Sequence, residues 1–510
     1  MNSFRAASIG PISARSLAAI AGVLAVWMLS SWLFWVGYVG VDDIFYARYA
    51  YLLHRPPMIW WEFRMPFILA VRASFALFGT SELAAAIPNL AASLALLAST
   101  AWMVGWPRKL TWQTNLTMIL AAMIPLDVGF RSWPGATCFA GSLCGVATAC
   151  WLRGKRWVPY AGSAVFALAF ASHETMVYYI AIFCSLSLLW DWKRFLKPTL
   201  LIGVLVAVNL SAEAVAYQYL LGNLLARFKV ASEGAGVSTA GVDLDSTITG
   251  LRYYLWPVEM LFTSKQFAGS LLMLFLASAV VWRKFEGHQK MLLLSVLFIW
   301  AWLGWGTMVP WAYKPFFRQY HYYLPLLLGI NTLMPAAVFL AFRPVAARAI
   351  LIALACFYFV AAAAGGRWGQ SFDASRALLD YAEKHPAITF LTDVSTMNQM
   401  YTIKGFSLPS NVVCRNGPAV KQHLLLNKEP ASAREFTFRE VEPQAILLNR
   451  EGPTLFPYDE EFLRFTEAHP GRHETVMPMR RKWLMAPLPQ LRESQAATLT
   501  LGAEAIYFKP

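Results

Sequence analysis

The sequence predicts a polytopic α-helical membrane protein with a small C-terminal α/β domain, and three observations lead to this fold class. Hydrophobic residues make up 57% of the 510 residues and charged residues only 14%, whereas about a quarter of a soluble protein is charged. Apolar stretches long enough to cross a bilayer recur through residues 1–365. Residues 366–510 instead mix polar and apolar positions. We therefore expect a transmembrane domain over residues 1–365 and an extracytoplasmic domain over residues 366–510.

The apolar stretches predict about eleven membrane-spanning helices. The first runs from about Ser16 to Val36 and exceeds the apolar core of a signal peptide, so we expect it to stay as an uncleaved helix. The others run over Leu83–Val104, Thr114–Val128, Pro134–Leu152, Trp157–Ala171, Met176–Trp190, Pro198–Leu221, Phe267–Trp282, Met291–Met308, Tyr322–Phe342 and Ala349–Gly365.

A further apolar segment, Met65 to Phe78, is about 14 residues long, too short to span comfortably, and contains Arg72. We expect it to be an interfacial or re-entrant helix on the outer side of the membrane, following the loop after the first helix.

Basic residues in the short connections predict the topology. By the positive-inside rule the connections face the cytoplasm, as does the N-terminus, and an odd number of crossings then places the C-terminal domain outside. The net charge of +14 is scattered over these loops, without a dense basic run, so we expect no nucleic-acid partner. The connections are Arg108-Lys109, Arg153 to Arg156, Lys193 to Lys197, Arg283 to Lys290, and Arg343 to Arg348.

The C-terminal 145 or so residues are long enough for one small domain. Asp373 to Lys384 has the periodicity of an amphipathic helix, and Asp459 to His469 predicts a second helix that ends at Pro470-Gly471. Ile388 to Leu391 and Ala445 to Leu448 predict buried strands.

Two adjacent acids, Asp42 and Asp43, directly follow the first predicted helix. They are placed where the chain first leaves the membrane, ahead of an aromatic amphipathic run, which favours chemistry on a substrate that arrives in the lipid. The alternative is that the two acids are merely solvated in an exposed loop.

Two more polar pairs interrupt apolar stretches at outer turns. His173 and Glu174 lie between two spans, where most other turns carry Lys or Arg. Asp127 and Arg131 bracket another turn. The first pair has the alternative of an ordinary tight turn, and the second that the two side chains pair with each other and fix the turn.

A third polar cluster follows the span that ends near Met308, and it contains Lys314, Arg318 and Tyr320 among aromatic residues. A guanidinium at the outer surface can bind a lipid-linked phosphate with two hydrogen bonds. The alternative is an aromatic belt with a snorkelling arginine.

The predicted topology places these carboxylates and Arg318 on one face of the membrane. A carboxylate can take a proton from an acceptor hydroxyl, and a cation can stabilise a departing phosphate. The grouping therefore favours transfer of a group from a lipid phosphate. A transporter or lipid flippase is the alternative, although intramembrane charges and an inverted repeat would be expected there and no such repeat is visible.

The order of these motifs resembles the GT-C glycosyltransferases, which include protein O-mannosyltransferases and the lipid A aminoarabinose transferase. Asp42-Asp43-x-x-Tyr46 is similar to the acidic motif of their first outer loop. The other matching stretches are Arg64-Met65-Pro66-Phe67, Leu77 to Pro88, Ser172-His173-Glu174-Thr175 and Arg318 to Pro325. Ala86 and His173 depart from the Arg and Lys that the family often has, which leaves the sugar open.

The resemblance implies a polyprenyl-phosphate sugar donor, a cell-envelope glycan, lipid or protein as acceptor, and an extracytoplasmic site in a bacterial inner membrane, usually with inversion at the anomeric carbon. Asp42 would be the base. We expect Asp43 to be a second, subordinate catalytic residue. Asp43, Asp127, His173 and Glu174 are candidates for acceptor or metal contacts, and Asp43 and Glu174 for ligands of a divalent Mg or Mn ion. The candidates for the donor phosphate are Arg318, Lys314, Arg64 and Tyr320.

Overall fold

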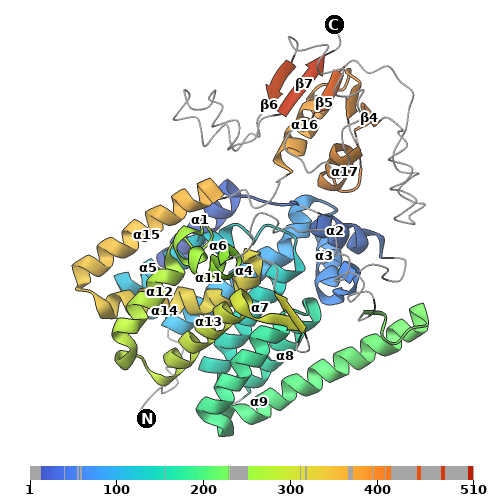
Figure 1. Ribbon diagram of the computed structural model, residues 1–510. Helices are drawn as coiled ribbons and strands as arrows, with labels where there is room; N and C mark the ends of the chain where they lie inside the picture. The colour runs from blue at the N-terminus through green and yellow to red at the C-terminus, as the bar shows by residue number, and fades with distance from the viewer. Residues whose placement is uncertain are drawn as a thin grey trace. The chain divides into compact units, whose positions relative to one another are not determined.

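A computed structural model gives the fold of the chain (Figure 1). It divides into two compact units, which are described separately. The first unit comprises Met1–Trp35, Leu53–Ala70 and Ile87–Gly366, and the second comprises Val36–Leu52, Val71–Ala86 and Arg367–Pro510. The structure describes residues 13–39, 41–53, 57, 60–155, 157–227, 229, 251–309, 312–315, 319–365, 372–392, 394–407, 409–414, 445–448, 473–476 and 504–508.

The first unit is built from helices, and every predicted apolar stretch falls on one of them. It holds α1 (Ala14–Leu33), α5 (Trp112–Met123), α6 (Pro125–Val128), α7 (Ala136–Arg153), α8 (Val158–Ser172), α9 (Met176–Leu221), α11 (Leu251–Thr263), α12 (Ser270–Val281), α13 (Gly287–Trp305), α14 (Leu327–Ala341), α15 (Pro344–Gly365), most of α4 (Glu82–Val104), the short helices η1 (Trp60–Phe63), η2 (Trp282–Lys284) and η3 (Tyr320–Leu326), and the antiparallel strands β1 (Thr307–Val309) and β2 (Ala312–Pro315).

Among the described residues, five helical segments are long and apolar enough to cross a membrane. They are Ala14–Leu33, Glu82–Val104, Met176–Leu221, Tyr320–Ala341 and Pro344–Ala362. The other predicted crossings are helices that are shorter or less apolar. The number of crossings therefore stays a prediction.

The largest differences from the predicted helices concern α9 and α11. The stretches predicted from Met176 and from Pro198 run together in α9, the long green helix of Figure 1, with a break at Asp191, where φ is −151° and ψ is 81°. Helix α11 lies between the apolar stretches predicted to end at Leu221 and to begin at Phe267, where the sequence predicts no helix. Its apolar face is interrupted by Glu259 and Pro257, so no run of spanning length marks it.

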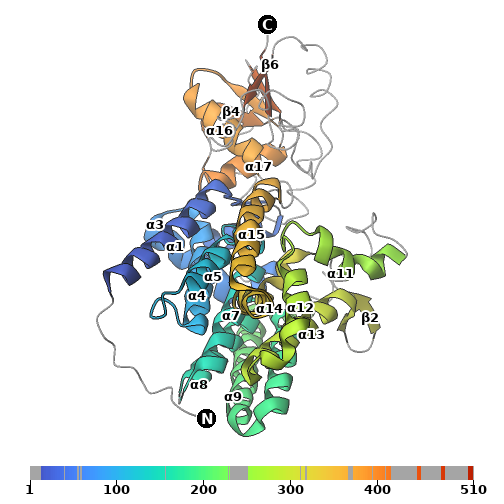
Figure 2. The same ribbon diagram turned by 90° about the vertical axis from the view of Figure 1, so that its left-hand side faces the viewer.

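Small residues bring the helices of the first unit close together. Helices α7 and α8 pack along their length, and Gly162 of α8 lies against the backbone of Ala147. Gly141 and Gly145 of α7 lie against Leu324 and Leu328 of the η3–α14 segment. Small residues at helix interfaces allow this close approach in membrane proteins. Helix α5 packs against both α1 and α15 (Figure 2).

The second unit joins chain segments that are far apart in sequence. It contains α2 (Val41–Leu52), the C-terminal part of α3 (Met65–Phe78), the first turn of α4, α16 (Asp373–Lys384) and α17 (Val394–Ile403). Its five-stranded sheet has the order β4-β3-β5-β7-β6, with parallel pairs around β3 and antiparallel pairs around β7. The strands are β3 (Phe390–Thr392), β4 (Val412–Cys414), β5 (Ala445–Leu448), β6 (His473–Val476) and β7 (Glu504–Phe508).

Several local predictions in this unit are confirmed. The predicted helices over Met65–Phe78 and Asp373–Lys384 have those bounds, and so has the strand Ala445–Leu448. The strand expected at Ile388 to Leu391 is β3, shifted toward Thr392. The helix predicted for Asp459 to His469 lies outside the described residues.

Candidate active site

The two adjacent acids lie in the first turn of helix α2 rather than in an extended loop. Asp43 is fully buried, and its two carboxylate oxygens accept hydrogen bonds from the backbone N–H groups of Val39 and Ile44. Asp42 is half-buried. A helix N-terminus favours negative charge, because its first N–H groups are not used within the helix. The neighbouring acids therefore have different environments, with Asp43 holding the backbone and Asp42 nearer to solvent.

The segment before this turn is fixed by an ion pair of the same unit. The Tyr38 N–H donates to Glu82 Oε1 at 2.7 Å, and Arg376 Nε donates to Glu82 Oε2 at 2.8 Å. Burial raises the pKa of the Tyr38 phenol well above its usual value, and the charges of Glu82 and Asp43 act in the same direction. Tyr38 is therefore a neutral phenol at physiological pH.

A second charged cluster lies in the first unit, around Glu174. Arg64 Nη2 donates to Glu174 Oε1 at 2.8 Å, and Arg227 Nη2 is 3.6 Å from Glu174 Oε2. Arg227 also donates to both carboxylate oxygens of Glu213, at 2.9 and 2.7 Å. The side chain of Arg64 is 3% exposed and that of Glu174 39% exposed. Two guanidinium groups thus hold one accessible carboxylate, and two acids balance the two cations.

The charges around Glu174 determine its protonation and that of His173. Burial raises the pKa of the Glu174 carboxyl, but the charges of Arg64 and Arg227 outweigh it and leave this pKa well below its usual range. Burial, followed by the charge of Arg64, lowers the pKa of His173 well below its usual value. The Thr175 N–H and hydroxyl lie 3.3 and 2.8 Å from His173 Nδ1. At neutral pH the cluster therefore contains an ionised Glu174 beside a neutral imidazole.

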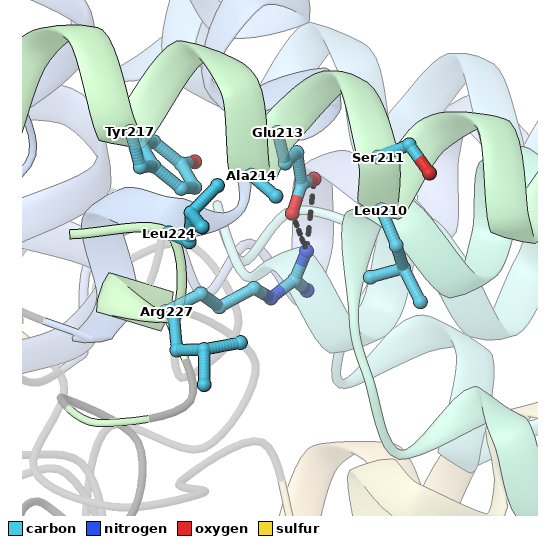
Figure 3. Close-up of a pocket in the computed structure, with 8 residues that line it drawn as sticks. Leu210, Ser211, Glu213, Ala214, Tyr217, Leu224 and Arg227 are labelled. Atoms are coloured by element: carbon cyan, nitrogen blue, oxygen red, sulfur yellow. Dashed lines mark hydrogen bonds and ion pairs between the residues drawn. The ribbon is translucent and has the colours of Figure 1, made fainter.

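A cavity of about 230 Å³ opens beside this cluster, between the C-terminal part of α9 and the segment after it (Figure 3). The ion pair of Arg227 and Glu213 faces into it, as Figure 3 shows, and the rest of its wall is mostly apolar. Tyr217 in the wall packs edge-on against Phe63, next in sequence to Arg64, with ring centroids 4.8 Å apart. The lining residues are Leu210, Ser211, Glu213, Ala214, Tyr217, Leu224, Leu225 and Arg227.

Sequence reasoning assigned no role to Glu213, because it is a single acid in an otherwise apolar predicted span. An acid within a spanning helix is costly without a partner, and that cost was the available signal. Its partner Arg227 lies beyond the end of the predicted span at Leu221, and no local pattern links the two residues.

Asp127 has the contacts of a structural pair. Its Oδ2 accepts a hydrogen bond from the Ser93 hydroxyl at 2.9 Å and lies 3.3 Å from Arg131 Nη1. The buried guanidinium of Arg131 also donates to the Ala122 carbonyl and to Ser30 Oγ, which ties α5 to α1. These contacts correspond to the alternative in which the two side chains fix their turn. The acceptor or metal role of Asp127 stays a prediction.

The donor-phosphate candidates near residue 318 are described only in part. Arg318 lies outside the described residues. Lys314 lies in strand β2, and Tyr320 begins η3. The Tyr320 ring packs against Trp256 and Phe267, with centroids 5.8 and 6.4 Å away, as in an aromatic belt.

Metal ligation is not supported by a preformed cluster. Within the part of the chain that the structure describes, no three His, Cys, Asp or Glu side chains are grouped so that they could hold a metal ion. The two oxygens of Asp43 already accept backbone hydrogen bonds. Asp43 and Glu174 belong to different units, so a metal bound by both stays a prediction from sequence.

The fold of this chain is shared with a protein of known structure. No protein-family model and no curated protein sequence matches it. The crystal structure of ArnT from Cupriavidus metallidurans in the apo state is similar, with 11% identity, a TM-score of 0.52, and coverage of 92% of this chain and 94% of that chain. The structure of the same protein bound to undecaprenyl phosphate gives 11% identity, a TM-score of 0.49, and coverage of 88% and 94%.

The likeness to apo ArnT defines the class as a mostly helical membrane fold. The chain therefore shares the fold of ArnT.

Proposed function

We propose that this protein is a glycosyltransferase that moves a sugar from a polyprenyl-phosphate donor to a hydroxyl of a cell-envelope glycan, lipid or protein at the outer face of the bacterial inner membrane. The observation that carries the proposal is the unequal environment of the adjacent acids. Asp43 is fully buried and bonded to backbone N–H groups, whereas Asp42 is half-buried on the same helical turn. The GT-C fold and the acidic motif supply the chemical setting.

In this proposal Asp42 is the general base. A hydroxyl is a poor nucleophile while protonated, and a carboxylate held against it accepts the proton as the bond between the anomeric carbon and the phosphate oxygen breaks. The acceptor oxygen then forms the new glycosidic bond with inversion. The departing phosphate takes both bonding electrons, so it needs cations rather than an acid.

The charged cluster of the first unit is given a supporting role. Glu174 keeps an accessible carboxylate between Arg64 and Arg227, which suits hydrogen bonding to a sugar or acceptor hydroxyl. Arg64 is also a candidate for the donor phosphate, but its guanidinium already donates to the Glu174 carboxylate. We assign the phosphate to Arg318, with Lys314 and Tyr320 as further candidates.

Donor consumption in proteoliposomes tests the function. The purified protein is reconstituted with each of a panel of polyprenyl-phosphate sugars and with a cell-envelope extract as the source of acceptor hydroxyls. Free polyprenyl phosphate and translocated intact donor are both measured. The proposal expects release of free polyprenyl phosphate with at least one donor, and release that is slower by about 10²- to 10⁴-fold with Asp42→Asn protein. Translocation of intact donor without release would instead favour a flippase.

A further inference from the structure

Arg376 attaches the segment just before the turn that bears Asp42 and Asp43 to the C-terminal part of the chain. Arg376 lies in α16, and its guanidinium contacts the Glu82 carboxylate with both Nε and Nη2. The same Nη2 donates to the Val36 carbonyl at 3.0 Å and lies 3.3 Å from the Tyr38 carbonyl. Arg376 and Glu82 are 294 positions apart in sequence, and both belong to the second unit.

The ion pair of Arg376 and Glu82 fixes the position of the two side chains relative to each other. The side chains of Arg376 and Glu82 are 16% and 12% exposed, so water screens their charges little. A guanidinium that bonds both oxygens of a carboxylate adds directional specificity to the electrostatic attraction. Glu82 in turn accepts the Tyr38 N–H, so the pair also fixes the backbone just before the acids.

The backbone is shaped to admit this pair. Gly37 has a φ of +62°, which favours glycine. A side chain at this position would collide with the Glu82 carboxylate and with Arg376 Nη2. The ion pair therefore occupies the space that any other residue at position 37 would fill.

The far end of α2 has a second attachment to the same part of the chain. The rings of Tyr51, in α2, and Phe406 stack with centroids 4.5 Å apart. Helix α2 is thus held at both ends by segments that follow residue 371, and Arg376 provides the charged contact at the end that carries the acids.

We propose that Arg376 is a positioning residue, which holds the turn bearing Asp42 and Asp43 in its active geometry through Glu82 and the carbonyls of Val36 and Tyr38. The catalytic part of this inference rests on the proposed function. It gives the C-terminal part of the chain a role in the reaction, namely to fix the acids rather than to contact the sugar. Misplacement of a reacting group by about 1 Å can lower turnover by about 100-fold.

The test uses the full-length protein in lipid nanodiscs and two readouts. Hydrogen–deuterium exchange of the peptide over residues 36–45 reports the turn, and steady-state transfer gives kcat and the donor KM. Arg376→Gln is expected to raise exchange in this peptide and to lower kcat by about 10- to 100-fold, with donor KM within twofold. Gly37→Ala, which changes no charge, is expected to do the same. Arg376→Lys, which keeps a cation beside Glu82 but loses the two-pronged contact, is expected to retain part of kcat.

Lys384→Gln is the matched control, because it breaks an exposed ion pair with Asp380 on the same helix. It should change neither readout. Unchanged exchange over residues 36–45 in Arg376→Gln, or unchanged kcat despite faster exchange, would overturn the proposal. If the wild-type protein transfers no sugar at all, the proposed function fails, and the exchange readout still decides whether Arg376 holds the turn.

Discussion

The turn of α2 and the cluster around Glu174 hold carboxylates in two different ways. Asp43 is held by backbone N–H groups, which are neutral and fixed by the fold. Glu174 is held by Arg64 and Arg227, whose charges keep it ionised. Backbone donors define a position, whereas guanidinium groups also set a charge. The turn of α2 therefore fixes the position of an acid, whereas the cluster around Glu174 keeps a carboxylate ionised.

The buried pair of Asp127 and Arg131 is expected to give the largest effect on stability. Arg131→Met leaves the Asp127 carboxylate buried without its cation, and breaking such a pair costs about 3–5 kcal/mol of unfolding free energy. Thermal denaturation in detergent measures the loss, with exposed Arg343→Met as control. If both variants denatured at the same temperature, the pair of Asp127 and Arg131 would not be structural, and a functional role for Asp127 would be favoured instead.

Removal of the Glu174 charge is expected to have an intermediate effect. Glu174→Gln keeps the size of the side chain and loses two charge-assisted contacts, each worth about 1.5–3 kcal/mol in buried settings and less for this partly exposed group. We expect transfer to fall by about 10-fold, mainly through acceptor KM. A fall in kcat as large as that of Asp42→Asn would instead assign the role of general base to Glu174.

The same carboxylate predicts a stability change at acid pH. The pKa of Glu174 is lower in the folded than in the unfolded chain, so its stabilisation is complete at neutral pH and is lost as the pH falls below the usual value of 4.5. The melting temperature of the wild-type protein should therefore fall more steeply below pH 4.5 than that of Glu174→Gln. Parallel pH curves for the two proteins would contradict this assignment.

His173 is expected to give the smallest effect. Since its pKa is well below the usual value, the imidazole is already neutral between pH 6 and 8 and should not titrate there. His173→Gln should leave the shape of the pH–activity profile unchanged over this range. A profile that loses an inflection near pH 6.5 would show that the wild-type imidazole carries charge in the active protein.

Local structure could be predicted from sequence where the pattern itself determines it. The apolar run of α3 begins at Met65 and ends before Gly79, whose φ is +76°, and the period of α16 is clear over twelve residues. Helix α11 was missed because a proline and an acid interrupt its apolar face. The acids were expected in a loop, although their position in the first turn of α2 follows the preference of acids for helix N-termini.

The candidate site could be predicted only as a set of residue types. The motif identified the acids and Glu174, but their partners come from distant parts of the chain. Arg64 and Glu174 are 110 positions apart, and Arg376 and Glu82 are 294 apart. Such pairs depend on tertiary packing, which no local pattern encodes.

The most direct test of the central claim measures donor binding and donor turnover on the same preparation of Asp42→Asn protein. This change keeps the size of the side chain and removes its basicity. We predict that donor affinity stays within about twofold, while turnover falls by about 10²- to 10⁴-fold, the usual contribution of a positioned base. Asp43→Asn serves as the comparison, and its main defect should be faster exchange of the turn. Near-normal turnover by well-folded Asp42→Asn protein would contradict the account.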